Sequence, residues 1–451
     1  MFDLLIKNAK VVTEEAVQKK NVAVKNGIIA AILPCSEVPK AEKTEDIGDK
    51  YLLPGGVDDH VHFNEPGYTW REDFAYASSA AAIGGITTVI DMPMQNEPAV
   101  ADAEIFRKKE ALLQGESVID YGFWGALVHT NEDALAGMDK EGALAFKCFM
   151  CDPGKGYTEL RLTEIEKVLI RLKTFNGLAG FHCEDYEMIK TLETAKIAAG
   201  KISREDYLEA RPPEAEIKAV RAILSLVRKT GGKAHICHVS HPAVAALVRE
   251  AKTEGLAVTA ETCMHYLLFT ERDLIDKGTL FKCSPPLRTA ENAEELWHYV
   301  LDGTIDCICS DHSPAKFEEK AEDGPCGTFG AWGGISGVQS GMQTFWNYAV
   351  NKKHVSPSLL AKALCANPAR IFGIYGQKGA IKVGFDADFV VLDAEADWEI
   401  TAESLAYKNK ISAFCGQKGK GLPVMTFVRG RLVCKNGKIE ASGTGMLLRK
   451  N

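Results

Sequence analysis

The sequence predicts an α/β protein: a (β/α)8 TIM-like barrel with a small β-sandwich module built from both chain ends. Three observations lead to this fold class. The 451 residues suffice for a barrel with insertions and a second module. In the middle of the chain, short apolar, β-branched runs alternate with longer amphipathic stretches. Both ends consist of short strand-like runs joined by tight turns.

Short strands are expected at both ends of the chain, at residues 4–6, 22–24, 28–33, 389–392, 426–431 and 432–434. Asn26-Gly27 and Asn436-Gly437 lie between or after such runs, and this dipeptide is a strong hairpin signal. Neither end alone has enough strands to bury one face of a sheet. We therefore expect residues 1–53 and 375–451 to form one β module, and residues 54–374 to form the barrel.

Eight further runs are expected as the barrel strands, at residues 57–62, 86–91, 121–128, 143–149, 178–182, 234–238, 257–261 and 305–311. Helical patterns such as 214–229 separate most of them. Alternation of strands and helices is typical of a parallel sheet, and eight strands close most economically into a barrel.

The charge pattern excludes two classes of partner. The formal net charge is -8 and no long basic run occurs, so a nucleic-acid or anionic-membrane surface is not expected. No secretory leader and no apolar stretch of membrane-spanning length is present, which indicates a cytoplasmic protein.

The 13 cysteines are scattered and fit reduced thiols. Cys148 and Cys151 form a C-x-x-C, but no second pair completes a zinc site.

Side chains that suit metal ions stand at the ends of five predicted strands. His60 and His62 lie two residues apart in the first strand, so both imidazoles point to one face. The members from later strands are Lys147, His182, His238 and Asp311. Barrel enzymes place their chemistry at the carboxyl ends of the strands. These six residues predict a site for two divalent ions with positions left open for water.

Lys147 is the unusual member of this set, since an ammonium has no lone pair and repels a cation. A lysine that has lost its proton can add carbon dioxide, and the carbamate has two oxygens that can bridge both ions. The alternative is a lysine in an ordinary ion pair. The neighbouring histidines favour the carbamate.

Five segments resemble the cyclic-amide branch of the amidohydrolase superfamily. They are PGGVDDHVH at 54–62, GGITTVIDMP at 84–93, FKCF at 146–149, SDHSP at 310–314 and KGAIKVGFDAD at 378–388. The resemblance spans nearly the whole chain. It implies a metal-dependent enzyme that opens ring amides of small molecules and that assembles as a homotetramer.

The resemblance also implies a ligand set and a cofactor of two divalent ions. The expected ligands are His60, His62 and Asp311 for one ion, His182 and His238 for the other, and carbamylated Lys147 for both. Zinc is expected, while manganese, cobalt or iron would accept the same nitrogen and oxygen donors.

Roles in catalysis and binding are expected for four residues. Asp311 is placed to take a proton from the attacking water and pass it to the leaving nitrogen. Asn64, Ser284 and Ser313 are expected to contact the substrate.

Local residues separate three activities within this branch. Dihydroorotases usually carry Arg two places after the second histidine and Asn just after Met-Pro, whereas this chain has Asn64 and Met94. Without that cation an anionic ring is hard to hold. Hydantoinases and dihydropyrimidinases usually place a tyrosine shortly after the lysine strand, where this chain has residues 150–153, MCDP.

Allantoinases resemble the chain at four segments: FKCF at 146–149, ETCMHY at 261–266, KCSPP at 282–286 and AWGGIS at 331–336. Two positions depart from their pattern, Met264 in place of proline and Tyr68 in place of arginine. Hydrolysis of allantoin to allantoate is therefore favoured, with hydantoinase, dihydropyrimidinase or dihydroorotase-like activity as alternatives. A non-catalytic assembly protein of this fold is the alternative of another class, and it would not need Lys147 or Asp311.

Two other histidines lie near these motifs. His312 follows Asp311 and is expected to point to the opposite face of its strand, so it would support the site without binding metal. His265 is the other histidine outside the ligand set with a potential role.

Overall fold

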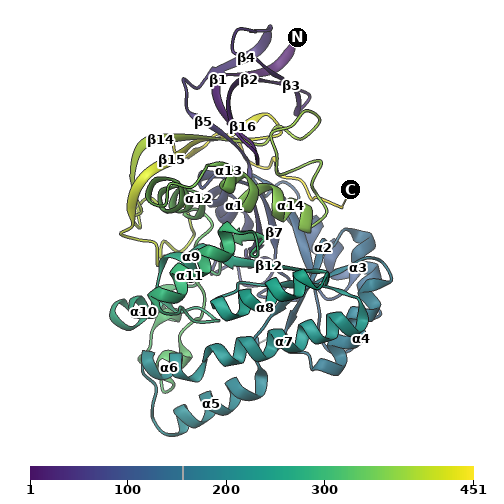
Figure 1. Cartoon of the computed structure of the whole chain (residues 1–451), viewed down its shortest axis with the longest axis vertical. Helices are drawn as coiled ribbons and strands as arrows, with labels where there is room; N and C mark the ends of the chain where they lie inside the picture. Colours follow the sequence, from purple (N-terminus) through teal and green to yellow (C-terminus); the bar gives the residue numbers. More distant parts are fainter. Residues whose placement is uncertain (155–156, 451) are drawn as a thin grey trace.

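The computed structural model describes residues 1–154 and 157–450. Figure 1 shows a barrel with its surrounding helices below and a β module above. The barrel strands, in chain order, are β6 (Gly56–Val61), β7 (Ile86–Asp91), β8 (Asp120–Ala126), β9 (Ala145–Phe149), β10 (Leu178–His182), β11 (Lys233–Ile236), β12 (Val258–Cys263) and β13 (Cys307–Cys309). Each strand pairs in parallel with its neighbour in sequence. The predicted barrel fold is confirmed.

The barrel closes between its first and last strands through residues just beyond β13. Val61 forms a parallel bridge with His312, and the His62 backbone N–H donates to the His312 carbonyl at 2.8 Å. Asp58 adds a side-chain contact, accepting from the backbone N–H of Ser310 at 3.1 Å. The segment that carries Asp311 is thereby held against the strand that carries His60.

Four predicted strands, 57–62, 121–128, 234–238 and 305–311, end one or two residues earlier in the structure than predicted. β11 ends at Ile236 and β13 at Cys309, whereas strands were expected to reach His238 and Asp311. Both residues have positive φ, 38° for His238 and 43° for Asp311. This left-handed conformation is incompatible with a continuing strand. It turns both side chains away from the strand direction at the point where the predicted site begins.

Helices surround the barrel and pack side by side, α2 against α3, α4 against α7, and α8 against both α7 and α11. The α-helices are α1 (Phe74–Ile83), α2 (Ala103–Leu113), α3 (Leu135–Glu141), α4 (Leu162–Lys173), α5 (Tyr186–Ala198), α6 (Arg204–Ala210), α7 (Pro213–Thr230), α8 (Pro242–Thr253), α9 (Met264–Leu268), α10 (Glu271–Lys277), α11 (Ala290–Leu301), α12 (Gly341–Phe345), α13 (Ser358–Ala361) and α14 (Asn367–Ile371). Short 3-10 helices are η1 (Thr279–Phe281), η2 (Phe317–Lys320) and η3 (Gly327–Gly330), and π-helical turns are η4 (Trp346–Lys352) and η5 (Lys362–Ala366). No helix within the described ranges is both long and apolar enough to span a membrane.

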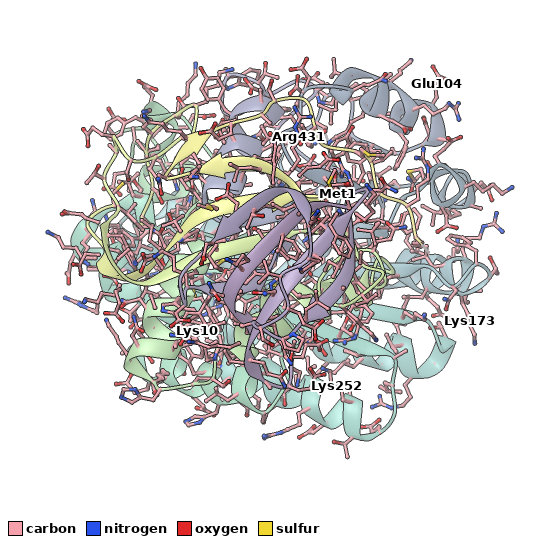
Figure 2. The ribbon with its side chains drawn as sticks, turned by 90° about the horizontal axis from the view of Figure 1, so that it is seen from above. Met1, Lys10, Glu104, Lys173, Lys252 and Arg431 are labelled. Carbon is pink, nitrogen blue, oxygen red and sulfur yellow. The ribbon has the colours of Figure 1, made fainter. Side chains whose placement is uncertain are left out.

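The second sheet takes strands from both chain ends, as predicted. Its strands are β1 (Phe2–Val12), β2 (Val17–Lys25), β3 (Ile28–Leu33), β4 (Ala41–Asp46), β5 (Tyr51–Pro54), β14 (Phe389–Glu399), β15 (Lys418–Val428), β16 (Arg431–Lys435) and β17 (Lys438–Ile439). β5 joins the two halves, because it pairs with β1 on one side and with β14 on the other. Figure 2 shows the purple N-terminal strands beside the yellow C-terminal strands. The expected boundaries, 1–53 with 375–451 against 54–374, stay a prediction.

A buried ion cluster lies between the β module and the barrel. The ammonium of Lys378 is fully buried and lies 2.5 Å from Asp120, the first residue of β8. It also lies 2.8 Å from both Asp386 and Asp388, which precede β14. Arg429, just after β15, donates to Asp120 as well. Because these charges are out of water, each depends on the others for its stabilisation.

We expect Lys378→Met to lower the free energy of unfolding by about 3–5 kcal/mol, because it leaves the buried Asp388 without the ammonium that it pairs with. Denaturant unfolding followed by circular dichroism measures this change. Lys418→Met is the matched control, since Lys418 pairs with Glu399 at 2.9 Å where both side chains are about half exposed or more. Its removal should cost less than about 1 kcal/mol. Equal losses in the two variants would contradict the prediction.

Candidate active site

The structure brings all six predicted ligand residues to one cavity. His60 lies in β6 and His62 just after it, Lys147 lies in β9, and the remaining three are His182, His238 and Asp311. All six line a cavity of about 440 Å³ at the carboxyl ends of the barrel strands, and none is more than 8% exposed. Such burial strengthens every electrostatic interaction within the set.

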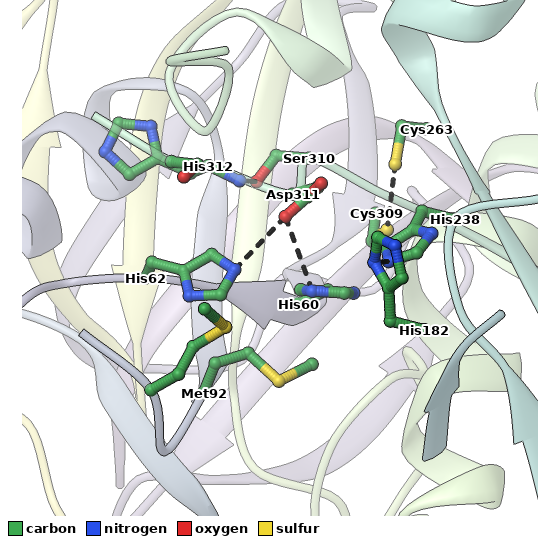
Figure 3. Close-up of polar contacts among 12 residues, drawn as sticks. His60, His62, Met92, His182, His238, Cys263, Cys309, Ser310, Asp311 and His312 are labelled. Carbon is green, nitrogen blue, oxygen red and sulfur yellow. Dashed lines mark hydrogen bonds and ion pairs between the residues drawn. The ribbon is translucent and has the colours of Figure 1, made fainter. Parts of the chain in front are cut away.

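One group within the cavity is centred on Asp311. Its Oδ1 lies 3.3 Å from Nε2 of His60 and 3.2 Å from Nε2 of His62, as the dashed lines in Figure 3 show. Burial favours the neutral acid, but the imidazoles of His60 and His62 outweigh it and hold the pKa of Asp311 far below its usual value. The residue is therefore a carboxylate, the form that binds metal ions.

A second group is formed by His182 and His238. Nδ1 of His182 lies 3.0 Å from Nε2 of His238, while Nε2 of His182 lies 2.8 Å from Glu184. Arg211 donates to the same Glu184 oxygen at 2.6 Å. Burial lowers the pKa of both imidazoles, so both are neutral and can offer a lone pair to a metal. Glu184 sets which nitrogen of His182 faces the cavity.

Lys147 lies between these groups without a conventional partner. Its side chain is fully buried, and Nζ has no hydrogen-bond acceptor among the described residues. No carboxylate in the described part of the chain lies within ion-pair distance of it either, and Nζ stands 5.1 Å from the centre of the Phe149 ring. Burial disfavours the ammonium, but the nearby Cys237, Glu261 and Asp311 outweigh burial and raise the pKa of Lys147. The distances give no support to the ordinary ion pair weighed from the sequence.

Glu261 is a site residue that the sequence analysis did not single out. Its fully buried carboxylate accepts from Nδ1 of His60, from Nε2 of His235 at 3.0 Å, and from the backbone N–H of His238 at 3.2 Å. The hydrogen bond to His60 keeps the proton on Nδ1 and leaves Nε2 for a metal. Glu261 ends the predicted strand 257–261, so its strand-end position was the signal that could have identified it.

Two of the three expected substrate contacts line the cavity. Ser284 and Ser313 do so, and the Ser284 hydroxyl lies 2.8 Å from that of Tyr207. Asn64 does not line it: the residue is fully buried at φ 61°, and its amide donates to the His62 carbonyl at 3.2 Å. A substrate contact at Asn64 stays a prediction. In this structure its left-handed turn and hydrogen bond fix the backbone that carries His62.

Several residues of the cavity wall were not foreseen, because they lie outside the segments with a recognisable pattern. They include Arg71, Arg211 and Glu319.

His312 points away from Asp311, as predicted (Figure 3). Its Nδ1 accepts from the Gly337 backbone N–H at 3.1 Å, so the proton resides on Nε2, which lies 3.8 Å from Glu72. Glu72 is fully buried and accepts from the Lys408 backbone N–H at 3.0 Å. Burial raises the pKa of Glu72 to about 8. His265 is also buried, with both ring nitrogens unpartnered among the described residues.

The cysteines carry no disulfide in the described part of the chain, where all thirteen are free. Burial raises the pKa of both Cys148 and Cys151, so neither is an activated thiolate.

The sequence profile of the amidohydrolase family matches residues 51–433. The chain belongs to the amidohydrolase family. Among its curated relatives is an allantoinase of Streptomyces avermitilis, 35% identical over 99% of both chains. An allantoinase of Solibacter usitatus is 36% identical over 100% of this chain and 97% of the relative. With the buried ligand set, this membership makes the chain a metal-dependent hydrolase of the cyclic-amide type.

Solved amidohydrolase structures share the whole architecture. The L-hydantoinase (dihydropyrimidinase) from Arthrobacter aurescens superimposes with a TM-score of 0.97 at 31% identity and full coverage of both chains. A dihydropyrimidinase from Brevibacillus agri superimposes with a TM-score of 0.93 at 27% identity, covering 100% of this chain and 99% of that one. The barrel and the β module are thus a common framework of this amidohydrolase branch.

We expect Glu72→Gln to gain stability over the wild type as the pH rises from 5 to 8. The folded pKa of Glu72, about 8, lies above the unfolded value near 4.5, so the stability that its proton contributes is lost through this window. Glutamine does not titrate and can still accept from Lys408. Denaturant unfolding at several pH values should show the difference growing by up to about 1.4 kcal/mol per pH unit. Glu395→Gln, at an exposed position, should show no trend; a flat difference for Glu72→Gln would refute the assignment.

Proposed function

We propose that this amidohydrolase opens the ring amide of allantoin to give allantoate. The observation that carries the proposal is the composition of the cavity wall. Lys282, Ser284, Ala331, Trp332 and Gly333 line it, and they belong to the two segments 282–286 and 331–336 that resemble allantoinases. The relatives named allantoinase match the chain nearly end to end, which supports the same assignment.

The donor set fits two divalent ions. We propose His60, His62 and Asp311 as ligands of one, His182 and His238 as ligands of the other, and carbamylated Lys147 between them. The supporting observations are neutral imidazoles, an ionised carboxylate and a buried lysine nitrogen without a partner among the described residues. We propose zinc, and the same donors accept manganese, cobalt or iron. When bound, such ions polarise a carbonyl and lower the pKa of water from roughly 16 toward about 7.

Lys147 would form the carbamate by adding carbon dioxide. The ammonium first loses a proton to solvent; the neutral amine then attacks the carbon, a C–N bond forms, the electron pair of one C=O π bond moves onto oxygen, and a second proton leaves the nitrogen to solvent. The product is an anion with two oxygens, which bound divalent ions would stabilise. The cavity already holds a buried nitrogen at this place, so only the carboxyl group has to be accommodated.

The residues of the chain have distinct roles in the proposed reaction. Asp311 takes the proton of the attacking water at its carboxylate and delivers it to the ring nitrogen as the amide bond breaks. Glu261 and Glu184 orient His60 and His182 through their second ring nitrogens. Ser284 and Ser313 offer hydroxyl groups to the ring from the cavity wall.

Hydantoinase or dihydropyrimidinase activity is the second candidate, favoured by the TM-score of 0.97 to an L-hydantoinase. The local residues argue against it. Tyr157 is the tyrosine that follows the lysine strand, but it is buried and its hydroxyl donates to the Lys147 carbonyl at 2.6 Å. That hydroxyl also accepts from the Leu127 N–H at 3.1 Å, so it does not serve a substrate. The expected homotetramer and cytoplasmic location stay predictions.

Allantoin should be the best substrate of a small panel. We would measure kcat/KM for allantoin, dihydroorotate, hydantoin and dihydrouracil with zinc, manganese and cobalt, because that ratio sets discrimination between substrates. Elemental analysis of protein purified without chelator should give two metals per chain. If dihydroorotate or hydantoin exceeds allantoin by about tenfold, equal to about 1.4 kcal/mol in transition-state stabilisation, the substrate assignment is wrong. An active, metal-free preparation would refute the mechanism.

Lys147→Ala should lose both metal and activity, since the bridging oxygens are absent. Short carboxylic acids such as acetate or propionate should restore part of each by supplying those oxygens. Metal content by elemental analysis and allantoin turnover are the two measurements. Lys109→Ala is a control for loss of a buried lysine, because Lys109 pairs with Asp91 and does not line the cavity. Carboxylic acids should not rescue it; full activity of Lys147→Ala would rule the bridge out.

A further inference from the structure

We propose that Arg71 selects substrates whose ring carries a neutral, carbonyl-bearing arm. This inference rests on the proposed function and deepens it, because allantoin is a ring amide with a ureido arm. Arg71 lies between β6 and α1, and its side chain lines the same cavity as the ligand set. It is 9% exposed, so its guanidinium acts in a largely dry environment.

The guanidinium of Arg71 is held from two sides. Glu319 accepts from Nε at 2.8 and 3.0 Å and from Nη2 at 2.5 Å. The ring of Trp332 stacks on it, with 3.8 Å between the guanidinium carbon and the ring centre. Trp332 is fixed in turn, because its indole N–H donates to the Ser313 carbonyl at 3.3 Å and its backbone N–H to the Glu319 carbonyl at 2.6 Å. Arg71 therefore loses little conformational entropy when it binds a ligand.

Arg71 retains unused donors. A guanidinium has five N–H donors, and Glu319 engages those on Nε and Nη2. Nη1 has no hydrogen-bond acceptor in the described part of the chain. Two other cationic side chains of the cavity wall, Arg211 and Lys282, already have acceptors. Arg211 donates to Glu184 and Glu193, and Lys282 to backbone carbonyls of the cavity wall. Nη1 of Arg71 is thus available to a carbonyl oxygen in the cavity.

The Glu319 carboxylate determines what kind of acceptor suits Arg71. The pair carries no net charge, so it offers N–H donors without a surplus cation. A substrate carboxylate would gain little attraction and would meet the oxygens of Glu319, whereas a ureido carbonyl keeps the hydrogen bond without that repulsion. The ring of Tyr68, which replaces the arginine common in allantoinases, lies 5.6 Å from the Arg71 guanidinium.

The test compares two variants on two substrates, using the metal-loaded protein. Arg71→Met should lower kcat/KM for allantoin by about 10- to 100-fold, the usual effect of losing a hydrogen bond from a charged donor. Hydantoin, which has the ring without the arm, should change by less than about threefold. Arg204→Met is the matched control. It removes an equally bidentate pair with Glu322, three residues from Glu319, and Arg204 does not line the cavity.

Equal losses for allantoin and hydantoin in Arg71→Met, or no loss for either, would overturn the proposal. A measurement on the wild type does not depend on a variant folding. Allantoin should exceed 5-propylhydantoin, whose arm has similar length and no carbonyl, by about tenfold or more in kcat/KM. A ratio near one would also overturn it. Wild-type protein that hydrolyses hydantoin but not allantoin would refute the proposed function, and this inference with it.

Discussion

The active site depends on one buried carboxylate, that of Glu261. It has no access to water and is stabilised by hydrogen bonds from His60, His235 and the backbone of His238. Those donors come from β6, from β11 and from the turn after β11, so the charge can be satisfied only when the barrel strands are in register. The same contacts orient His60 and position His238. The need to stabilise the buried Glu261 carboxylate thus both holds the barrel strands in register and orients the proposed ligands His60 and His238.

The fold was predictable because its signals are local and repeated. The predicted strands 86–91 and 178–182 coincide with β7 and β10, since every residue of both is buried and continuous apolar runs are typical of parallel strands. The ends of β11 and β13 were placed two residues too late. Nothing in their composition distinguishes a strand from the left-handed turn that His238 and Asp311 adopt. Tertiary contacts decide the conformation at such positions.

The convergence of the six proposed ligands could be predicted from the sequence, but the side of the cavity wall around Arg71 could not. His60, His62 and the other strand-end residues are fixed by the barrel, so their convergence follows from topology. Arg71 precedes Glu319 of η2 by 248 residues, and only the closed barrel brings Arg71 to Glu319 and the nearby Trp332. Asn64 lies two residues after His62, and its side chain was expected to reach the substrate. In the structure its φ is positive, and the side chain donates to the backbone carbonyl of His62.

The pairing of β5 with both β1 and β14 has a consequence for synthesis on the ribosome. β5 ends at Pro54, but its partner β14 begins only at Phe389. At about 5–20 residues per second, tens of seconds pass before that partner exists. During this interval the barrel is translated while β5 presents an open edge, a template for pairing with other chains. The nascent chain therefore passes through a stage in which the edge of β5 is open to pairing with other chains, whereas β14 covers that edge in the folded protein.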